Sequence, residues 1–324
     1  MTGTDLATQD PWRAALAAPG PRPTDGLDAD SPTGWPNAPW FRNSAFRFFS
    51  FVMIASVLTA VASVGLSGVT GSPGLGELLA IVTAYLVVVW LLENRGWPFE
   101  LRLRRWRGLL VGLALGAGAC LVVVGVLVLV GARRFTGVDA DYSWVYPFFR
   151  IGVVAGVAEE IMFRGIIHRL VESHWGTWVA LAVSSLAFGG VHLTNPDATI
   201  WGAVAIAVEA GLMFGTLYTL TRSLWLVIGV HAAWNVVQGP VLGSVVSGAD
   251  LFGAGWFTSE PSGPDWLSGG AFGIEASPVA VVVWLIVAVW AIRKIVREGR
   301  VIAPFWVRHR RARSVLPDEV DQES

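Results

Sequence analysis

Residues 108–132 read GLLVGLALGAGACLVVVGVLVLVGA, an apolar run without a charged side chain. A helix needs about 20 such residues to cross roughly 30 Å of hydrocarbon. A soluble domain carries about 25% charged residues, whereas this chain of 324 residues has 15% charged and 54% hydrophobic residues. The run therefore predicts a membrane-spanning helix in an integral membrane protein.

Similar apolar runs recur along the chain, separated by short blocks of charge. Each run is expected to be helical, because lipid offers no partner to an unpaired backbone group. The sequence thus predicts an all-α fold, a polytopic membrane helical bundle with about eight transmembrane helices. The expected spans are 46–68, 75–92, 108–132, 146–168, 175–194, 198–220, 223–241 and 276–296.

The basic residues predict how this bundle is oriented. If the N-terminus is cytoplasmic, all of the 23 Lys and Arg residues except Arg133, Arg134 and Arg150 fall on the cytoplasmic side. The positive-inside rule therefore favours two cytoplasmic termini. Among the basic residues only Lys294 is a lysine. We attribute this bias to genome composition and expect a bacterial plasma membrane.

These patterns divide the chain into several parts. Residues 1–42, rich in Pro, Gly, Asp and Thr, predict a disordered cytoplasmic tail. The other expected parts are three N-terminal transmembrane helices (43–145), a central core (146–240), an extracytoplasmic loop (241–275), a C-terminal transmembrane helix (276–298) and a basic cytoplasmic tail (299–324). The net charge of −1 gives no reason to expect nucleic acid as a partner. Membrane lipid and membrane-anchored molecules are the expected partners.

Pairs of small residues four positions apart predict close contacts between helices. Such pairs occur at Gly112 and Gly116, at Gly152 and Gly156, and at Gly211 and Gly215. The second pair lies directly before two intramembrane acids, so it predicts that this helix packs tightly beside a site.

Ionisable residues inside the predicted spans are few. Each costs roughly 2.5–3.5 kcal/mol at mid-bilayer on insertion scales, and such residues often mark functional sites. The fourth span contains VAEEIMFR (157–164), the fifth ends in FGGVH (188–192), and the seventh contains HAAWN (231–235). The sixth contains Glu209, for which we expect a packing or cavity position and assign no role.

Helix geometry suggests separate roles for the two adjacent acids. Glu160 and Arg164 are four residues apart and share a helix face, so they are expected to pair. Glu159 is turned about 100° away and has no such cation on its own helix. A buried carboxylate without a paired cation suits a general base near neutral pH. His231 and Asn235, also four apart, present two polar groups from one face of the seventh span.

The distances along the chain from one interhelical connection predict that Glu159 and His192 lie at similar depth in the membrane. Glu159 and His192 are equidistant from a turn near 175–176, which would place them side by side in an antiparallel helix pair. This arrangement requires the fourth and fifth spans to extend about 10 Å past the cytoplasmic boundary at 1.5 Å per residue. His168 and His174 would then lie at a cytoplasmic turn in contact with solvent.

Together these residues resemble the CPBP family, intramembrane proteases related to the type II CAAX prenyl endopeptidases and to bacteriocin-immunity (Abi) proteins. The family pattern is Glu-Glu-x-x-x-Arg, then Phe-x-x-x-His, then His-x-x-x-Asn/Asp on separate helices. The sequence contains all three in order, as Glu159-Glu160-x-x-x-Arg164, Phe188-x-x-x-His192 and His231-x-x-x-Asn235. The resemblance covers roughly 146–240, which would be the catalytic core.

The resemblance implies a peptide hydrolase. Glu159 would be the general base that activates water, and His192 would help to hold that water. His231 and Asn235 would stabilise the oxyanion of the tetrahedral intermediate. The remaining pair of the pattern, Glu160 and Arg164, would organise the site.

Two chemistries stay open for the water. The family is often described as metalloproteases, and zinc bound by Glu159, His192 and His231 would activate water directly. The chain has no His-Glu-x-x-His helix, so we favour a metal-free glutamate mechanism with no cofactor.

The expected substrate is a membrane-anchored peptide or protein, with a CAAX-type prenylated partner as one option. The main alternative is a non-catalytic immunity or scaffold protein of the same family, in which the site is a structural network. A proton-coupled transporter is the third class, because buried Glu and His residues can form proton relays. We rank it lower, because no paired halves are visible in the sequence.

Overall fold

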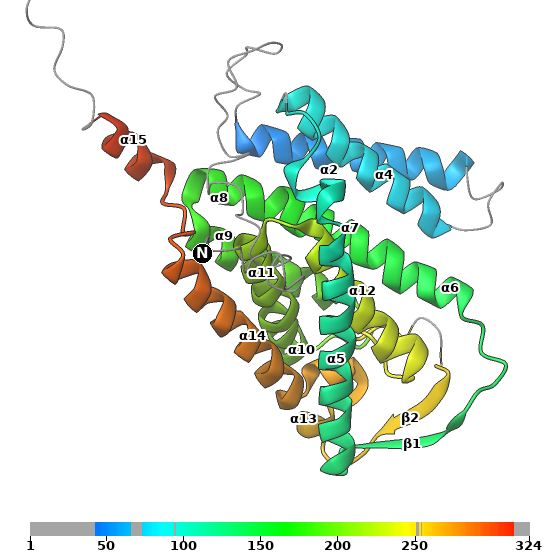
Figure 1. The fold of residues 1–324 in the computed structure, drawn as a ribbon. Coiled ribbons are helices and arrows are strands. Elements are labelled where there is room, and N and C mark those ends of the chain that lie inside the picture. Colours follow the sequence, from blue (N-terminus) through cyan, green and yellow to red (C-terminus); the bar gives the residue numbers. More distant parts are fainter. Residues whose placement is uncertain (1–42, 66–72, 94, 251–252, 254, 314–324) are drawn as a thin grey trace, which may run out of the picture.

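Helices dominate the computed structural model, which describes residues 43–65, 73–93, 95–250, 253 and 255–313 (Figure 1). The predicted tail 1–42 and the last part of the predicted basic tail (314–324) lie outside these residues. Seven of the described helical segments are long and apolar enough to cross a membrane. These are Ser44–Ser63, Gly74–Leu92, Leu103–Leu129, Thr177–Thr194, Ile200–Thr221, Leu224–Val241 and Pro278–Arg297. They coincide with all predicted spans except the fourth, and the polytopic helical bundle is confirmed.

The predicted fourth span is one continuous helix, but it carries too many charges to be counted among the seven. It comprises α6 (Val145–Pro147), η6 (Phe148–Ala155), α7 (Gly156–Glu160), η7 (Ile161–His168) and α8 (Arg169–Trp175). At 1.5 Å per residue this helix, residues 145–175, is about 46 Å long, more than the roughly 30 Å of a hydrocarbon core, and it is called the long helix. Its η6 and η7 stretches are π-helical, a geometry that often marks functional sites. They flank the short α-helical turn that carries Glu159 and Glu160.

The N-terminal part contributes three helices. The helix α2 (Ser44–Gly65) lies beside α4 (Pro73–Val87), which continues as η3 (Val88–Leu92), and both run along the long helix (Figure 1). Two short turns, η4 (Phe99–Leu101) and η5 (Leu103–Arg105), lead into α5 (Arg107–Leu129).

The rest of the bundle follows the long helix in the chain. Its elements are α9 (Thr177–Val191), η8 (His192–Thr194), α10 (Ile200–Ile206), η9 (Ala207–Leu212), α11 (Met213–Thr221), α12 (Leu224–Val236), η10 (Val237–Val241), α13 (Asp265–Ser268), η11 (Gly270–Phe272), η12 (Ile274–Ala276), α14 (Pro278–Arg297) and α15 (Phe305–Arg313).

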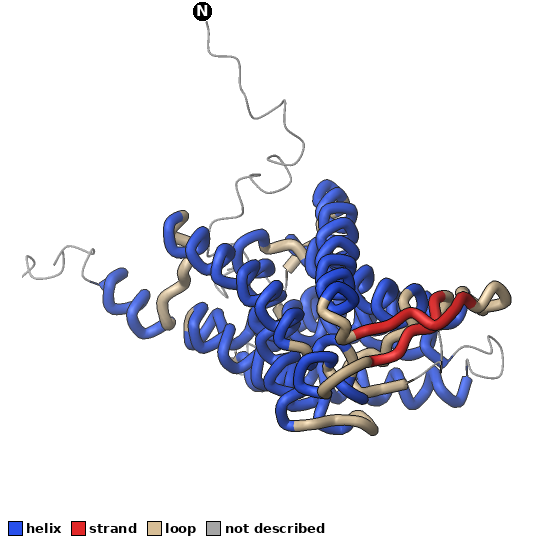
Figure 2. Tube along the Cα trace, turned by 90° about the horizontal axis from the view of Figure 1, so that it is seen from below, coloured by secondary structure: helices blue, strands red, loops and turns tan. Residues whose placement is uncertain are grey.

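A two-stranded antiparallel ribbon was not predicted. The strand β1 (Arg133–Val138) pairs with β2 (Phe257–Pro261), with an irregularity between Phe135 and Gly137. Seen from below, the strands lie in front of the helices, at the end of the bundle where α5 ends (Figure 2). The segment predicted as an extracytoplasmic loop is therefore partly ordered by pairing with a distant strand.

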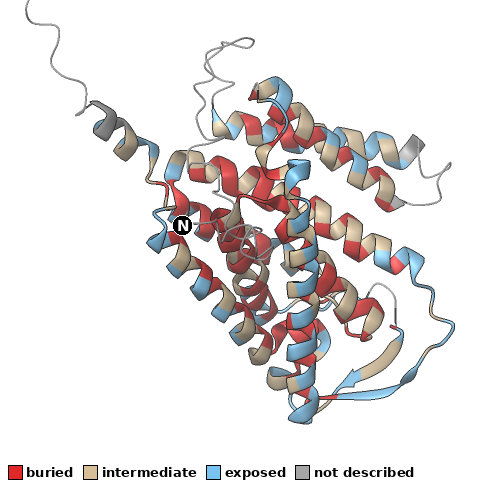
Figure 3. Cartoon of the chain, viewed as in Figure 1, coloured by how far each residue is buried: buried red, intermediate tan, exposed pale blue. Residues whose placement is uncertain are grey.

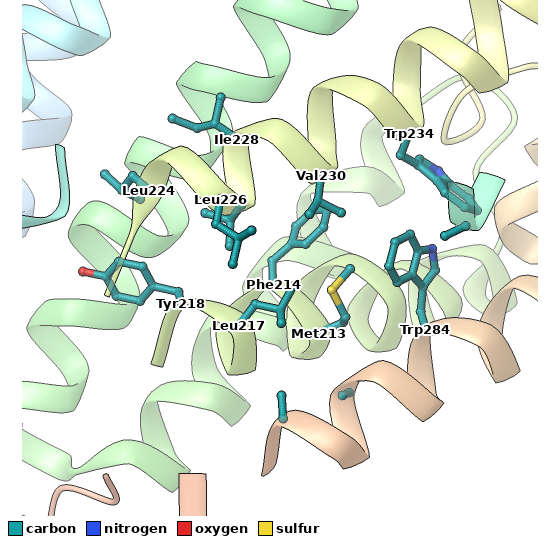
Figure 4. Close-up of a cluster of buried hydrophobic side chains, with 14 of the residues drawn as sticks. Met213, Phe214, Leu217, Tyr218, Leu224, Leu226, Ile228, Val230, Trp234 and Trp284 are labelled. Atoms are coloured by element: carbon teal, nitrogen blue, oxygen red, sulfur yellow. The ribbon is translucent and has the colours of Figure 1, made fainter. Parts of the chain in front are cut away.

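The core lies between α5, α11, α12 and α14. Buried residues concentrate on α11 and α12, whereas α5 is exposed along one side (Figure 3). Figure 4 shows part of this core, where Met213 and Phe214 of α11 face Val230 and Trp234 of α12. The rings of Trp234 and Trp284 meet edge to face at 5.2 Å.

Glycines set the spacing of these helices, as their pairs predict. A Cβ atom at Gly112 or Gly116 of α5 would collide with the backbone of α12. One at Gly152 would come within 2.6 Å of Val236, and one at Gly156 within 3.3 Å of Ala232. Both the long helix and α5 therefore pack closely on α12, because the glycines have no side chains that would separate the helices.

A buried network of charges joins the helices at the predicted cytoplasmic end. Arg169 of α8 donates to Glu93 at 2.9 Å, and Arg95 bridges Glu93 and Glu100 at 3.1 and 3.0 Å. Tyr85 of α4 donates to Glu100 at 2.6 Å. These contacts connect α4, the turn that follows it, and the long helix.

His168 does not contact solvent, contrary to the expectation from the sequence. Its side chain is fully buried, with ring nitrogens 3.3 Å from Ser184 Oγ and 3.0 Å from Thr219 Oγ1. His174 lies at the end of α8 and stacks on Phe305 at 4.5 Å. The long helix continues past His168 for two more turns, and this extra length buries His168 between α9 and α11.

Candidate active site

The predicted site residues come together on the face of the long helix that packs against α12. Gly152 and Gly156 permit this contact, and α7 presents Glu159 and Glu160 next to His231. Close helix packing therefore brings carboxylates from one helix to an imidazole on another.

Glu160 is fully buried and lies between two cationic or polar partners. Its Oε1 is 2.8 Å from Arg164 Nη1 and 2.9 Å from His231 Nδ1. A carboxylate only accepts hydrogen bonds, so His231 donates from Nδ1. This fixes the imidazole orientation and leaves Nε2 on the other side of the ring.

Arg164 anchors this arrangement to a third helix. Its Nη2 donates to the carbonyl oxygens of Ala210 (2.5 Å) and Gly211 (3.3 Å) in η9. The guanidinium also lies over the rings of Phe188 and Phe214, 4.7 and 5.0 Å from their centroids. The pairing of Glu160 and Arg164 expected from their spacing is thus present, and it fixes three helices together.

Glu159 has a different environment from its neighbour. Its side chain is 29% exposed, and its Oε2 lies 4.0 Å from His231 Nε2. That oxygen has no hydrogen-bond partner among the described residues. Glu159 lines a cavity of about 380 Å³, whereas Glu160 lies behind it.

His192 and Asn235 line the same cavity from two other helices. The Nδ1 of His192 is 2.7 Å from the carbonyl oxygen of Phe188, so this nitrogen is the donor. In the neutral ring, Nε2 is then an acceptor. Asn235 donates one amide hydrogen to the carbonyl of Ile151 at 3.3 Å, which leaves the other amide hydrogen for a further acceptor.

Further ionisable groups lie at the rim and at the inner end of the site, and no role was predicted for them from the sequence. Glu77 of α4 and Arg150 of η6 line the cavity and form an ion pair at 3.3 Å. Further in, a space of about 20 Å³, enough for one water, adjoins Glu209 and Glu275. Arg150 could have been noticed in the sequence, because it is one of only three basic residues away from the predicted cytoplasmic side.

Of the predicted zinc ligands, Glu159 Oε2 and His231 Nε2 lie 4.0 Å apart. Zinc holds nitrogen and oxygen ligands at about 2.0–2.2 Å. Among the described residues, no three His, Cys, Asp or Glu side chains converge as metal ligands do. His231 uses Nδ1 for Glu160.

Comparison with known protein families supplies an independent observation. Residues 141–237 match the family model described as type II CAAX prenyl endopeptidase Rce1-like. This segment forms an Rce1-like domain. No curated protein and no solved structure matches the chain. All the candidate site residues lie inside the Rce1-like domain, whereas α2, α4, α5 and α14 lie outside it.

The family assignment agrees with the fold. The Rce1-like family is one of CAAX-type endopeptidases, and the apolar helices make the chain an integral membrane protein. At family level the Rce1-like domain is therefore that of an intramembrane peptidase.

Proposed function

We propose that the protein is an intramembrane endopeptidase that hydrolyses a peptide bond with water activated by Glu159. The observation that carries this proposal is the contrast between two adjacent acids. Glu160 is enclosed by Arg164 and His231, while the side chain of Glu159 is 29% exposed and lines a cavity. A general base must reach its water and must not be neutralised by a fixed ion pair.

His192 is proposed as the second group that holds the water. With Nδ1 donating to the Phe188 carbonyl, Nε2 accepts one hydrogen of the water and Glu159 accepts the other. The oxygen lone pair is then free to attack the carbonyl carbon. Glu159 takes the proton and later delivers it to the leaving nitrogen, so the products are one carboxylic acid and one amine. The second proton of the water then passes from the acid to the amine, which gives a carboxylate and an ammonium group.

His231 and Asn235 are proposed as donors to the oxyanion. The Glu160 carboxylate beside Nδ1 supports a positively charged imidazole, whose Nε2–H then points toward the reacting groups. The second amide hydrogen of Asn235 adds another donor. Donors arranged in advance around developing charge supply a large share of catalysis.

The proposed substrate is a membrane-anchored peptide or protein, with CAAX-type partners suggested by the family name. The polar groups lie among apolar lining residues, including Met162, Phe163 and Val191. These apolar side chains could contact the apolar side chains of a substrate held in the bilayer. We further propose that both termini face the cytoplasm of a bacterial cell, on the basis of the charge distribution.

The test uses purified protein in nanodiscs with membrane-anchored reporter peptides. We expect Glu159→Gln to lower the cleavage rate about 100- to 10,000-fold with no loss of thermal stability. Glu260→Gln, the same change on the exposed strand β2, is the control and should cut at the wild-type rate.

Each reaction is repeated with a zinc chelator. Unchanged cleavage supports the glutamate mechanism, and lost cleavage that zinc restores supports the zinc ligand set. If a broad peptide panel is never cut, or Glu159→Gln cuts as fast as wild type, the non-catalytic immunity or scaffold function replaces this proposal.

A further inference from the structure

The segment after η10 folds back toward the candidate site as a tight turn, Val246–Ala249. The amide of Ala249 donates to the carbonyl of Val246 at 2.9 Å. The central residues Ser247 and Gly248 have φ of 52° and 75°. Two successive positive values are typical of a type I′ turn, which suits glycine but costs free energy at serine. The surroundings must therefore hold Ser247 in this conformation.

Ser247 is held on both sides of its backbone. Its N–H donates to Glu275 Oε2 at 2.5 Å, and its carbonyl accepts from Asn195 Nδ2 at 2.6 Å. Asn195 follows His192 by three residues and also lines the cavity. The turn is thus attached to the segment that carries one of the proposed catalytic residues.

Gly248 is attached in the same way through its backbone. Its N–H donates to the carbonyl of Phe272 at 2.8 Å, and its carbonyl accepts from the amide of Asp197 at 2.9 Å. All backbone polar groups of the two central residues are therefore hydrogen-bonded outside the turn.

Glu275 connects this turn to the helix that carries His231 and Asn235. It is 3% exposed, and its Oε1 accepts from Ser247 Oγ at 3.2 Å and from Trp234 Nε1 at 3.1 Å. Trp234 lies on α12 between the two site residues. One carboxylate therefore fixes the turn relative to the proposed oxyanion donors.

The turn also forms part of the cavity wall. Val246, Ser247 and Ala249 line the cavity together with Glu159. The long helix contributes Ala155 and Ala158 to the same lining. The alanines leave room for a substrate side chain, and the larger side chain of Val246 limits its size.

We propose that the turn Val246–Ala249 is the specificity wall of the peptidase site, and that Glu275 is the residue that positions it. This inference rests on the proposed peptidase function. The wall selects a small apolar side chain next to the cleaved bond. Glu275 is a positioning residue, since it acts through Ser247 and Trp234.

The test measures kcat/KM on paired membrane-anchored peptides that differ only in Ala or Leu beside the cleaved bond. We expect Val246→Ala to enlarge the site and raise the Leu-to-Ala ratio of kcat/KM about 10-fold or more, the usual effect of a few methylenes in an apolar pocket. Ala249→Leu should lower the ratio by a similar factor. Glu275→Ala should bring the ratio toward 1, and Glu275→Gln, which keeps the size and one acceptor, should restore part of the selectivity.

If Glu275 had a purely structural role, Glu275→Ala would lower kcat/KM for both peptides by the same factor and leave the Leu-to-Ala ratio unchanged. That result would overturn the inference. The size variants keep the test decisive if Glu275→Ala does not fold. Absence of cleavage by the wild-type protein would instead contradict the proposed function itself, so the two failures are distinguishable.

Discussion

At the residue scale, Glu159 and Glu160 are neighbours in the chain with separate environments. Replacing Glu160 with Gln would leave Arg164 fully buried without a carboxylate partner. Breaking one side of a buried ion pair costs about 3–5 kcal/mol. We therefore expect Glu160→Gln to lower the melting temperature clearly, in contrast to Glu159→Gln.

A double variant separates stability from chemistry. Glu160→Gln combined with Arg164→Met removes both charges and should recover much of the lost stability. Cleavage should stay low, because His231 has lost the carboxylate beside Nδ1. Thermal unfolding and peptide cleavage measured on the same samples check both points, and a double variant less stable than Glu160→Gln alone would contradict them.

The sequence predicted one half of this residue-scale arrangement. The four-residue spacing of Glu160 and Arg164 predicted their pairing. The rotation of about 100° per helical residue predicted that Glu159 faces away from this pair. The contact of Glu160 with His231 was not predictable, because it depends on how two helices pack. For Glu209 the sequence predicted a packing or cavity position but no role. The structure buries it beside the innermost space with Oε1 unpaired among the described residues.

At the scale of elements, the approach of α5 to α12 depends on glycines. A Cβ atom at Gly116 would collide with the Val230 carbonyl, whereas one at Gly118 would meet no atom within 4 Å. We expect Gly116→Ala to lower the melting temperature and Gly118→Ala to keep or raise it, since alanine favours helix more than glycine does. The two variants make the same change on one helix, so equal melting temperatures would contradict a packing role for Gly116.

The charge network at the predicted cytoplasmic end makes stability depend on pH. Burial alone would raise the pKa of Glu93, but the charges of Arg169 and Arg95 outweigh it and hold the pKa below its usual range. The pKa of Glu100 is lowered in the same way, against burial, by Arg95 and Arg169. A lowered folded-state pKa gives stability that is complete above the unfolded value of about 4.3 and is lost as pH falls through the folded value.

We therefore expect a melting temperature that changes little from pH 7 to about 5 and falls below about 4.3. Glu93→Gln should lower the neutral melting temperature and flatten this acid limb. Glu260→Gln, at an exposed site, should leave the curve unchanged. Melting temperatures measured from pH 3 to 8 test this. An acid limb as steep in Glu93→Gln as in wild type would show that other groups cause it.

At the scale of the whole molecule, the distribution of basic residues predicts the orientation in the membrane, whereas the fold fits either orientation. Cys120 is the only cysteine of the chain and is buried, so Cys120→Ala gives a cysteine-free background. In that background, Thr258→Cys on β2 should react with a membrane-impermeant thiol reagent added to intact cells. Glu298→Cys, after α14, should react only after the cells are opened. The reverse pattern would invert the topology.

The sequence predicted the helical bundle because each span is a run of consecutive apolar residues, whose length is read directly from the sequence. It did not predict the ribbon of β1 and β2, whose partners are more than a hundred residues apart. Nor did it predict that the loop before α14 would supply a wall of the cavity. Both depend on contacts between distant segments, which no local pattern in the sequence records.

The position of Glu275 in the chain has a consequence for synthesis. Residues 159–235, with all the proposed catalytic groups, leave the ribosome before Glu275 does. A nascent chain at that stage has its water-activating groups, while the turn at 246–249 still lacks its anchor. The turn is therefore expected to reach its final conformation only after Glu275 and α14, which completes the core, have been made.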